Sequence, residues 1–225
     1  MKLRYFLFFP LFIIVFPAFP QEIVTAERYL EMVSERYGVI RDYEANIVIL
    51  SGSNQMYGTV SHLAPAFLRL DFTRPMDQVI VFNGDLLTVY LPEYRMVLNQ
   101  TINRRSSTGA GLVSAQGLAL LRRNYVPSFV TGPQPEPLEA GSSERVVKLR
   151  LTRKSISEGF REIIVSVNPD TKLIRRLEGR TIAGGQVQFD FSNVKINQGI
   201  PEQRFIYDSP PSANMYNNFL FRDID

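Results

Sequence analysis

The stretch PAFLRLDFTRPMDQVIVFNGDLLTVYLPE, residues 65–93, holds the clearest structural pattern in the chain. Apolar and polar residues alternate in FLRLDF, QVIVF and LLTVYL, as they do in strands that bury one face. Pro75 and the pair Asn83-Gly84 interrupt the alternation, and Asn-Gly is typical of a tight hairpin turn. The stretch therefore predicts consecutive antiparallel strands rather than a parallel α/β sheet.

The same pattern continues on both sides of this stretch. Further strand-like segments are YEANIVIL (43–50), MYGTVSHLA (56–64), RMVLNQ (95–100), ERVVKLRL (144–151), FREIIVSVN (160–168), LIRRLEGRTI (173–182), GQVQFDFSNV (185–194) and QRFIYD (203–208). A sheet with about eleven strands is expected to curl. The predicted fold class is therefore mainly β (α+β), an open, incomplete antiparallel β-barrel.

Two segments have the spacing of amphipathic helices. In residues 22–37 the apolar side chains recur at helical intervals, with Thr25 as a possible N-cap and Gly38 as a possible end. Residues 112–123 form the second helix, which Gly117 weakens by roughly 1 kcal/mol relative to alanine. One helix precedes the strands and the other lies between two groups of strands, so both can cover the concave side of the sheet.

The N-terminus is typical of a secretory signal peptide. Lys2 and Arg4 precede an apolar segment over residues 5–19 that several prolines interrupt. We expect residues 1–21 to be the signal peptide, ending near Ala18 or Gln21, and a retained anchor is the other interpretation. Residues 22–225 are then one domain. Losing Lys2 and Arg4 lowers the formal charge from +3 to about +1, so nucleic-acid binding is not expected.

Residues suited to catalysis are scarce. The chain contains no cysteine, which excludes disulfides and thiolate ligands. His62 is the only histidine, and we expect it at the surface or at a cavity rim. Asp71 and Asp190 alternate with apolar neighbours and are expected to face solvent, which disfavours a pair of catalytic carboxylates. We therefore expect no enzymatic activity, no metal site and no cofactor.

A curled sheet leaves a concave face rich in Leu, Val, Ile, Phe and Tyr. Its inward side chains either fill the interior or leave space for a ligand, and periodicity does not decide between these alternatives. A helix of low stability over an apolar cavity would suit a hydrophobic ligand that must later be released.

Two long segments carry a resemblance to a known family. Residues 58–93, GTVSHLAPAFLRLDFTRPMDQVIVFNGDLLTVYLPE, and residues 161–214, which include FSNVKINQGIPEQRF and a later Pro-Pro pair, follow each other in the order typical of that family. In these segments the chain resembles the bacterial outer-membrane lipoprotein carrier proteins (LolA/LolB-like). With the helix at 22–37, the resemblance covers most of the mature chain.

The resemblance implies an open barrel whose hydrophobic cavity, under a helical lid, holds the acyl chains of lipoproteins. The protein would be a periplasmic chaperone and a monomer, receiving acylated lipoproteins from an inner-membrane releasing transporter and delivering them to an outer-membrane acceptor. The alternative is a periplasmic regulator that senses lipids or lipoproteins on the same half-barrel. The expected lipid-binding residues are Val60, Leu68, Leu70, Phe72, Val79, Val81, Tyr90, Val165, Val187, Phe189 and Phe191, with Leu112, Ala115, Leu118 and Leu121 in the lid.

One position departs from the family. An arginine usually precedes the proline of the turn after the strand at 56–64 and holds the lid shut, whereas Ala64 stands there in this chain. We expect Arg69, on the next strand, to serve as the lid latch if its side chain points inward.

Overall fold

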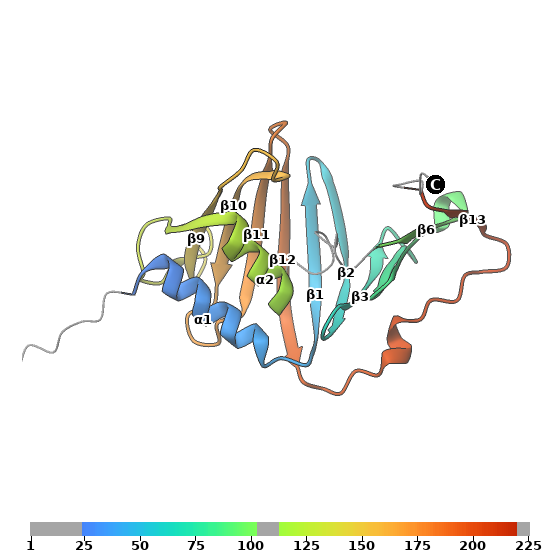
Figure 1. The fold of residues 1–225 in the computed structure, drawn as a ribbon, viewed down its shortest axis with the longest axis horizontal. Coiled ribbons are helices and arrows are strands. Elements are labelled where there is room, and N and C mark those ends of the chain that lie inside the picture. Colours follow the sequence, from blue (N-terminus) through green and yellow to red (C-terminus); the bar gives the residue numbers. More distant parts are fainter. Residues whose placement is uncertain (1–23, 103–112, 220–225) are drawn as a thin grey trace, which may run out of the picture.

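The computed structural model describes residues 24–102 and 113–219, which form one large curled sheet with two helices against it (Figure 1). Its strands are β1 (Asp42–Ser51), β2 (Asn54–Leu63), β3 (Phe67–Arg74), β4 (Val79–Asn83), β5 (Leu86–Leu91), β6 (Met96–Thr101), β7 (Tyr125–Phe129), β8 (Glu136–Pro137), β9 (Arg145–Arg153), β10 (Phe160–Val167), β11 (Ile174–Thr181), β12 (Gln186–Ile196) and β13 (Asn214–Asn217). The strand order is β13-β6-β5-β4-β3-β2-β1-β12-β11-β10-β9-β7, and β8 pairs with β9. Among these strands every pairing is antiparallel except that of β13 with β6, and the sheet does not close. The predicted fold class is confirmed.

The strands differ from the prediction in detail. The segment 203–208 is not a strand, because η2 (Glu202–Phe205) is a short 3-10 helix. Three short strands, β7, β8 and β13, have no clear alternation in the sequence. Pro127 lies within β7, which is possible because β7 is the last strand of the sheet and a proline there interrupts no central ladder.

Both helices begin at a side-chain cap. In α1 (Ala26–Gly38) the Thr25 hydroxyl accepts a hydrogen bond from the Arg28 amide, as the sequence predicted. In α2 (Ala115–Asn124) the Ser114 hydroxyl accepts one from the Gly117 amide. The signal peptide and Leu112, the predicted first residue of this helix, lie outside the described residues. The 3-10 helix η1 (Pro92–Tyr94) connects β5 to β6.

The sheet has two differently covered faces. The inner face carries α1 and α2, and its side chains form the main core with Leu30, Val33 and Leu118 of the helices. Figure 1 shows the helices over the half of the sheet from β9 to β12, while β3 to β6 extend away from them. The outer face is the opposite one. Residues 197–218, here called the C-terminal segment, cross it and end at β13.

The C-terminal segment packs a second, smaller core on the outer face. Phe205 is 1% exposed and contacts a cluster that includes Val79 and Val81. Its ring lies 5.4 Å from that of Phe67, and the Tyr207 ring lies 5.8 Å from that of Tyr90. This core fixes the C-terminal segment to β3 and β4.

Close approach of two strands explains one glycine. A Cβ atom at Gly58 of β2 would collide with the backbone carbonyl oxygen of Asp71 on β3. Because that obstacle is backbone, a side chain at this position would force the strands apart. Gly58 is therefore required by the geometry of the sheet.

Within residues 24–102 and 113–219, no helix is both long enough and apolar enough to cross a membrane.

Replacing the anchor of the second core should destabilise the fold strongly. Phe205→Ala removes a fully buried ring and is expected to lower the free energy of unfolding by about 3–5 kcal/mol. Chemical denaturation measures this loss. The control, Ile206→Ala, changes a side chain that is 63% exposed and should alter stability by less than about 0.5 kcal/mol. Equal effects of the two variants would contradict the packing role of Phe205.

Candidate functional site

The candidate site is the inner face of the sheet where α2 covers it. The antiparallel register places one row of inward side chains across the strands, for example Ala45 opposite Val60 and Val60 opposite Leu70. The row continues on the other side of β1, where Ile49 lies opposite Phe189. Alternate residues of a strand point to opposite faces, and the apolar residues of the alternating pattern occupy the inward positions. This row is therefore almost wholly apolar.

Most of the predicted lining residues lie on this inner face. They belong to the main core or pack against it: Val60, Leu68, Leu70, Phe72, Leu118, Leu121, Val165, Val187, Phe189 and Phe191. Val165 is fully buried, whereas Leu68, Leu70, Val187 and Phe189 are only partly buried. Ala115 lies at the start of α2 and is partly buried. Contact of these side chains with lipid stays a prediction.

The prediction is wrong for Val79, Val81 and Tyr90, which lie on the outer face. Val79 is opposite Asp71 and Val81 is opposite Arg69, so all four side chains share that face. The inward residues of β4 are the other set, Ile80 and Phe82. A shift of one residue reverses every assignment in a strand. Both faces of β4 are apolar because Phe205 covers the outer one, and this contact has no local signal in the sequence.

Arg69 is not a lid latch. Its guanidinium donates to both carboxylate oxygens of Asp71 at 2.9 Å and to the backbone carbonyl of Arg204 at 3.0 Å. Arg204 donates in turn to Asp71 at 2.6 Å. These three side chains hold the C-terminal segment on the outer face, on the opposite side of the sheet from α2. Arg69 points outward because successive side chains of a strand alternate between the two faces, and its neighbours Leu68 and Leu70 occupy the inward positions of β3.

Tyr43 contacts the residues that lead into α2. Its buried hydroxyl donates a 2.9 Å hydrogen bond to the backbone carbonyl of Val113, two residues before α2. The ring is 3% exposed and lies edge-on to Tyr37 of α1. Burial raises the pKa of Tyr43, so its hydroxyl keeps its proton and remains a donor. Tyr43 thus joins the centre of the sheet to the beginning of α2.

His62 supports Tyr43 from the neighbouring strand. Its ring centroid lies 5.1 Å from that of Tyr43, and its Nδ1 atom lies 2.8 Å from the backbone oxygen of Phe67, to which it donates in the Nδ1–H tautomer. The side chain is 5% exposed, so of the two expected locations the surface is wrong, and His62 is not among the residues that line the cavity beside α2. Burial lowers the pKa of His62. A neutral imidazole is therefore part of the packing beneath Tyr43.

Helix α2 is weakly held compared with the sheet beneath it. It has ten residues and contains Gly117, which disfavours the helix by about 1 kcal/mol relative to alanine. A helix of this length has little stability of its own in water. Leu118 and Leu121 anchor it on the inner face, and Arg122 donates to Glu31 of α1 at 2.9 Å between exposed side chains. Such a surface pair adds little stability.

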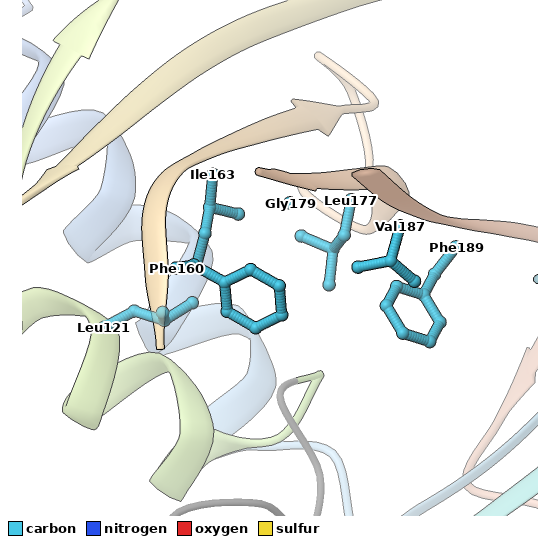
Figure 2. Close-up of a pocket in the computed structure, with 7 residues that line it drawn as sticks. All are labelled: Leu121, Phe160, Ile163, Leu177, Gly179, Val187 and Phe189. Atoms are coloured by element: carbon cyan, nitrogen blue, oxygen red, sulfur yellow. The ribbon is translucent and has the colours of Figure 1, made fainter. Parts of the chain in front are cut away.

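The space between α2 and the sheet is small. A cavity of about 10 Å³ lies there, lined by Leu121, Phe160, Ile163, Leu177, Gly179, Val187 and Phe189 (Figure 2). This volume holds about one water molecule, although the lining is apolar. Figure 2 shows the rings of Phe160 and Phe189 pointing into this region from the sheet. The protein's own side chains therefore fill the inner face under the helices.

Beyond α2 the apolar face continues without full burial. Leu68, Leu70 and Ile80 are only partly buried, and so are Leu87 and Val89, which lie opposite Phe82 and Ile80. Within the described ranges, no group of three or more His, Asp or Glu side chains is placed to hold a metal ion. On β3 to β5 the inner face is thus an apolar surface that the described helices leave partly uncovered.

Removing the Tyr43 hydroxyl should loosen α2 selectively. Tyr43→Phe keeps the ring but deletes the bond to Val113, and we expect it to lower stability by about 1 kcal/mol. Hydrogen exchange of the α2 amides should become faster. The control is Tyr37→Phe, since the Tyr37 hydroxyl is also buried but accepts from the Ile174 amide on β11. Faster α2 exchange in both variants, or in neither, would contradict the assignment.

The burial of His62 predicts a dependence of stability on pH. The unfolded histidine has a pKa near 6.5, and the folded one has a lower pKa, so the unfolded chain binds more protons below that pH. Stability is therefore expected to fall as the pH drops from about 6.5. Thermal melts of the wild type and of His62→Gln between pH about 7 and about 5 measure the difference. An equally steep decline in both proteins would assign the effect to other groups.

The sequence resembles known proteins over most of its length. The family described as "Outer membrane lipoprotein carrier protein LolA" matches residues 50–208. A curated outer-membrane lipoprotein carrier protein of Dechloromonas aromatica is 24% identical over 162 residues, which cover 72% of this chain and 71% of the relative.

Solved structures share the fold at lower sequence identity. An uncharacterized conserved protein of Thermus thermophilus aligns with a TM-score of 0.56 and 14% identity, over 85% of this chain and 98% of that one. The lipoprotein LppX of Mycobacterium tuberculosis aligns with a TM-score of 0.51 and 12% identity, over 78% of this chain and 97% of that one. The Pseudomonas aeruginosa MucA/MucB complex gives a TM-score of 0.51 and 14% identity, over 84% of this chain and 62% of that one.

The matched family covers most of the chain, and the family's description names carriers rather than enzymes. The chain belongs to the LolA family of outer-membrane lipoprotein carrier proteins.

Proposed function

We propose that this protein is a periplasmic carrier that binds the acyl chains of lipoproteins on its inner face. It takes them from an inner-membrane releasing transporter and delivers them to an outer-membrane acceptor. The observation that carries the proposal is the continuous apolar inner face, filled under α2 and only partly buried on β3 to β5. Family membership supports the same role.

The physical need for such a carrier follows from the cost of exposing hydrocarbon to water. Burial of an acyl chain contributes about 0.8 kcal/mol per methylene group, so a chain of about 15 methylenes resists leaving a membrane by roughly 12 kcal/mol. Only an apolar surface of comparable extent offsets that cost. The inward side chains of β2, β3 and β12 supply such a surface.

Loading requires a change at α2, because a cavity with room for about one water molecule cannot hold an acyl chain. In this proposal the described structure is the closed form of the carrier. Displacing α2 exposes Leu118 and Leu121 together with the side chains beneath them, and the acyl chain packs where the helix had been. Release is favoured when α2 returns and the hydrogen bond from Tyr43 to Val113 forms again.

This exchange keeps binding reversible. The acyl chain packs on the same apolar side chains that α2 covers in the closed form, so part of the free energy of its burial is spent on displacing the helix. The net free energy of binding is therefore smaller than the gross burial suggests. A carrier with a permanently open cavity would bind its cargo more tightly and release it less readily. A weak helix of ten residues with an internal glycine suits this role.

Site-specific crosslinking on one strand tests which face holds the lipoprotein. A photoreactive amino acid at Leu70, on the inner face of β3, is expected to crosslink to an acylated lipoprotein when the protein is incubated with donor membranes and the releasing transporter. The matched control is Thr73, an exposed residue of the same strand. Crosslinks should form at Leu70 and be absent at Thr73, as measured by immunoblotting of the lipoprotein.

Mass spectrometry of the protein purified under native conditions completes the test. A carrier both retains acyl material and releases a membrane-embedded lipoprotein into the aqueous fraction. A lipid-sensing regulator on the same fold would retain acyl material without releasing lipoprotein. Finding neither bound acyl material nor release would reject both functions.

A further inference from the structure

The strand-to-strand turns at one end of the sheet expose large apolar side chains. Because the strands are antiparallel, alternate turns lie at the same end, and the ladders place five connections there. Ser51 is opposite Val187, Phe160 is opposite Thr181, and Tyr57 is opposite Arg74. We call this end the turn rim; it comprises residues 52–53, 75–78, 92–95, 154–159 and 182–185.

Four of these five connections carry one exposed large apolar residue each. The exposed fractions are 74% for Met76, 64% for Tyr94, 83% for Ile156 and 57% for Ile182. The strand-to-strand turns at the opposite end, residues 64–66, 84–85 and 168–173, expose no such side chain. Single exposed apolar residues are ordinary, but here four of them occupy neighbouring turns at the same end of one sheet.

The turn rim is also basic. Within two residues of its turns the basic side chains are Arg74, Arg95, Arg153, Lys154, Arg161 and Arg180, and the acidic ones are Asp77, Glu93 and Glu158. Six positive charges against three negative ones favour an anionic partner. Apolar and aromatic side chains beside arginine and lysine are typical of surfaces that enter the boundary between lipid headgroups and acyl chains.

The turn rim is continuous with the candidate site. Phe160 directly follows the turn 154–159, Val187 closely follows the turn 182–185, and both line the cavity beside α2 (Figure 2). Lys154 in the same turn as Ile156 donates to the backbone carbonyl of Arg123 at 2.9 Å, at the end of α2. A surface that contacts the turn rim therefore lies next to the helix that must move.

We propose that the turn rim docks the protein on an anionic phospholipid surface, with Met76, Tyr94, Ile156 and Ile182 entering the headgroup region. The inference rests on the proposed carrier function, since docking would place the inner face beside the bilayer that supplies or receives acyl chains. Association is weak and reversible, because a few apolar side chains and a modest charge excess hold the protein only transiently.

Vesicle flotation of the full chain tests this docking. The wild type is expected to bind vesicles of phosphatidylcholine with phosphatidylglycerol more strongly than vesicles of phosphatidylcholine alone, and high salt should weaken the binding. Ile156→Ser with Ile182→Ser should reduce the partition coefficient by about tenfold. The matched control, Val39→Ser with Ile206→Ser, changes two residues that are 66% and 63% exposed away from the turn rim, and should leave binding unchanged.

A fluorescent label reports the contact directly, because the chain contains no native cysteine. An environment-sensitive fluorophore on Ile156→Cys should shift its emission to the blue when anionic vesicles are added, whereas the same label on Val39→Cys should not. Equal shifts at both positions, no binding by the wild type, or no preference for phosphatidylglycerol would each overturn the proposal. These vesicles contain no lipoprotein, so a failure to bind them would overturn the docking proposal but not the carrier function. Binding to vesicles without release of lipoprotein from donor membranes would reject the carrier function alone.

Discussion

The pairing of β1 with β12 is the interaction on which the rest of the structure depends. This ladder joins the half of the sheet that runs from β1 through β6 to the half that runs from β12 back to β9 and β7. Its register sets Tyr43, Ile47 and Ile49 on the same face as Phe189 and Phe191. Since directly opposed residues share a face, this register carries the inward and outward assignment from one half of the sheet to the other.

The two faces then have separate tasks. The outer face is fastened by charged and aromatic contacts, and Asp190 accepts hydrogen bonds from Arg176 at 2.6 Å and from Arg175 at 3.0 Å. On the same face the C-terminal segment is held by Phe205 and by the Arg69, Asp71 and Arg204 side chains. The residues that line the cavity beside α2, by contrast, are apolar or glycine. The sheet can therefore stay rigid while its inner face changes partners.

The inner face combines a filled core with α2, the helix that the proposed function displaces. α1 contributes Leu30 and Val33, which are fully buried, and it belongs to the permanent core. α2 is shorter, contains a glycine, and its beginning is joined to β1 through the hydroxyl of Tyr43. The stability of the protein thus resides mainly in contacts that the proposed cargo need not disturb. This division is consistent with a carrier, in which binding must be reversible without unfolding.

The sequence by itself determined the class of the fold, the two helices and the turn at Asn83-Gly84, because alternation, helical spacing and turn residues are local properties. Most of the lining residues that it predicted, from Val60 to Phe191, also lie on the inner face. Only the tertiary structure decided the face of Val79, Val81 and Tyr90, the outward direction of Arg69 and the reach of Tyr43 to Val113. Each of these depends on a segment distant in the chain: Phe205 covers one face of β4, and the register of β3 assigns Arg69 to that face. The local sequence pattern contains no information about such distant partners. When a strand is apolar on both faces, its inward face can be assigned only after its neighbouring strands are known.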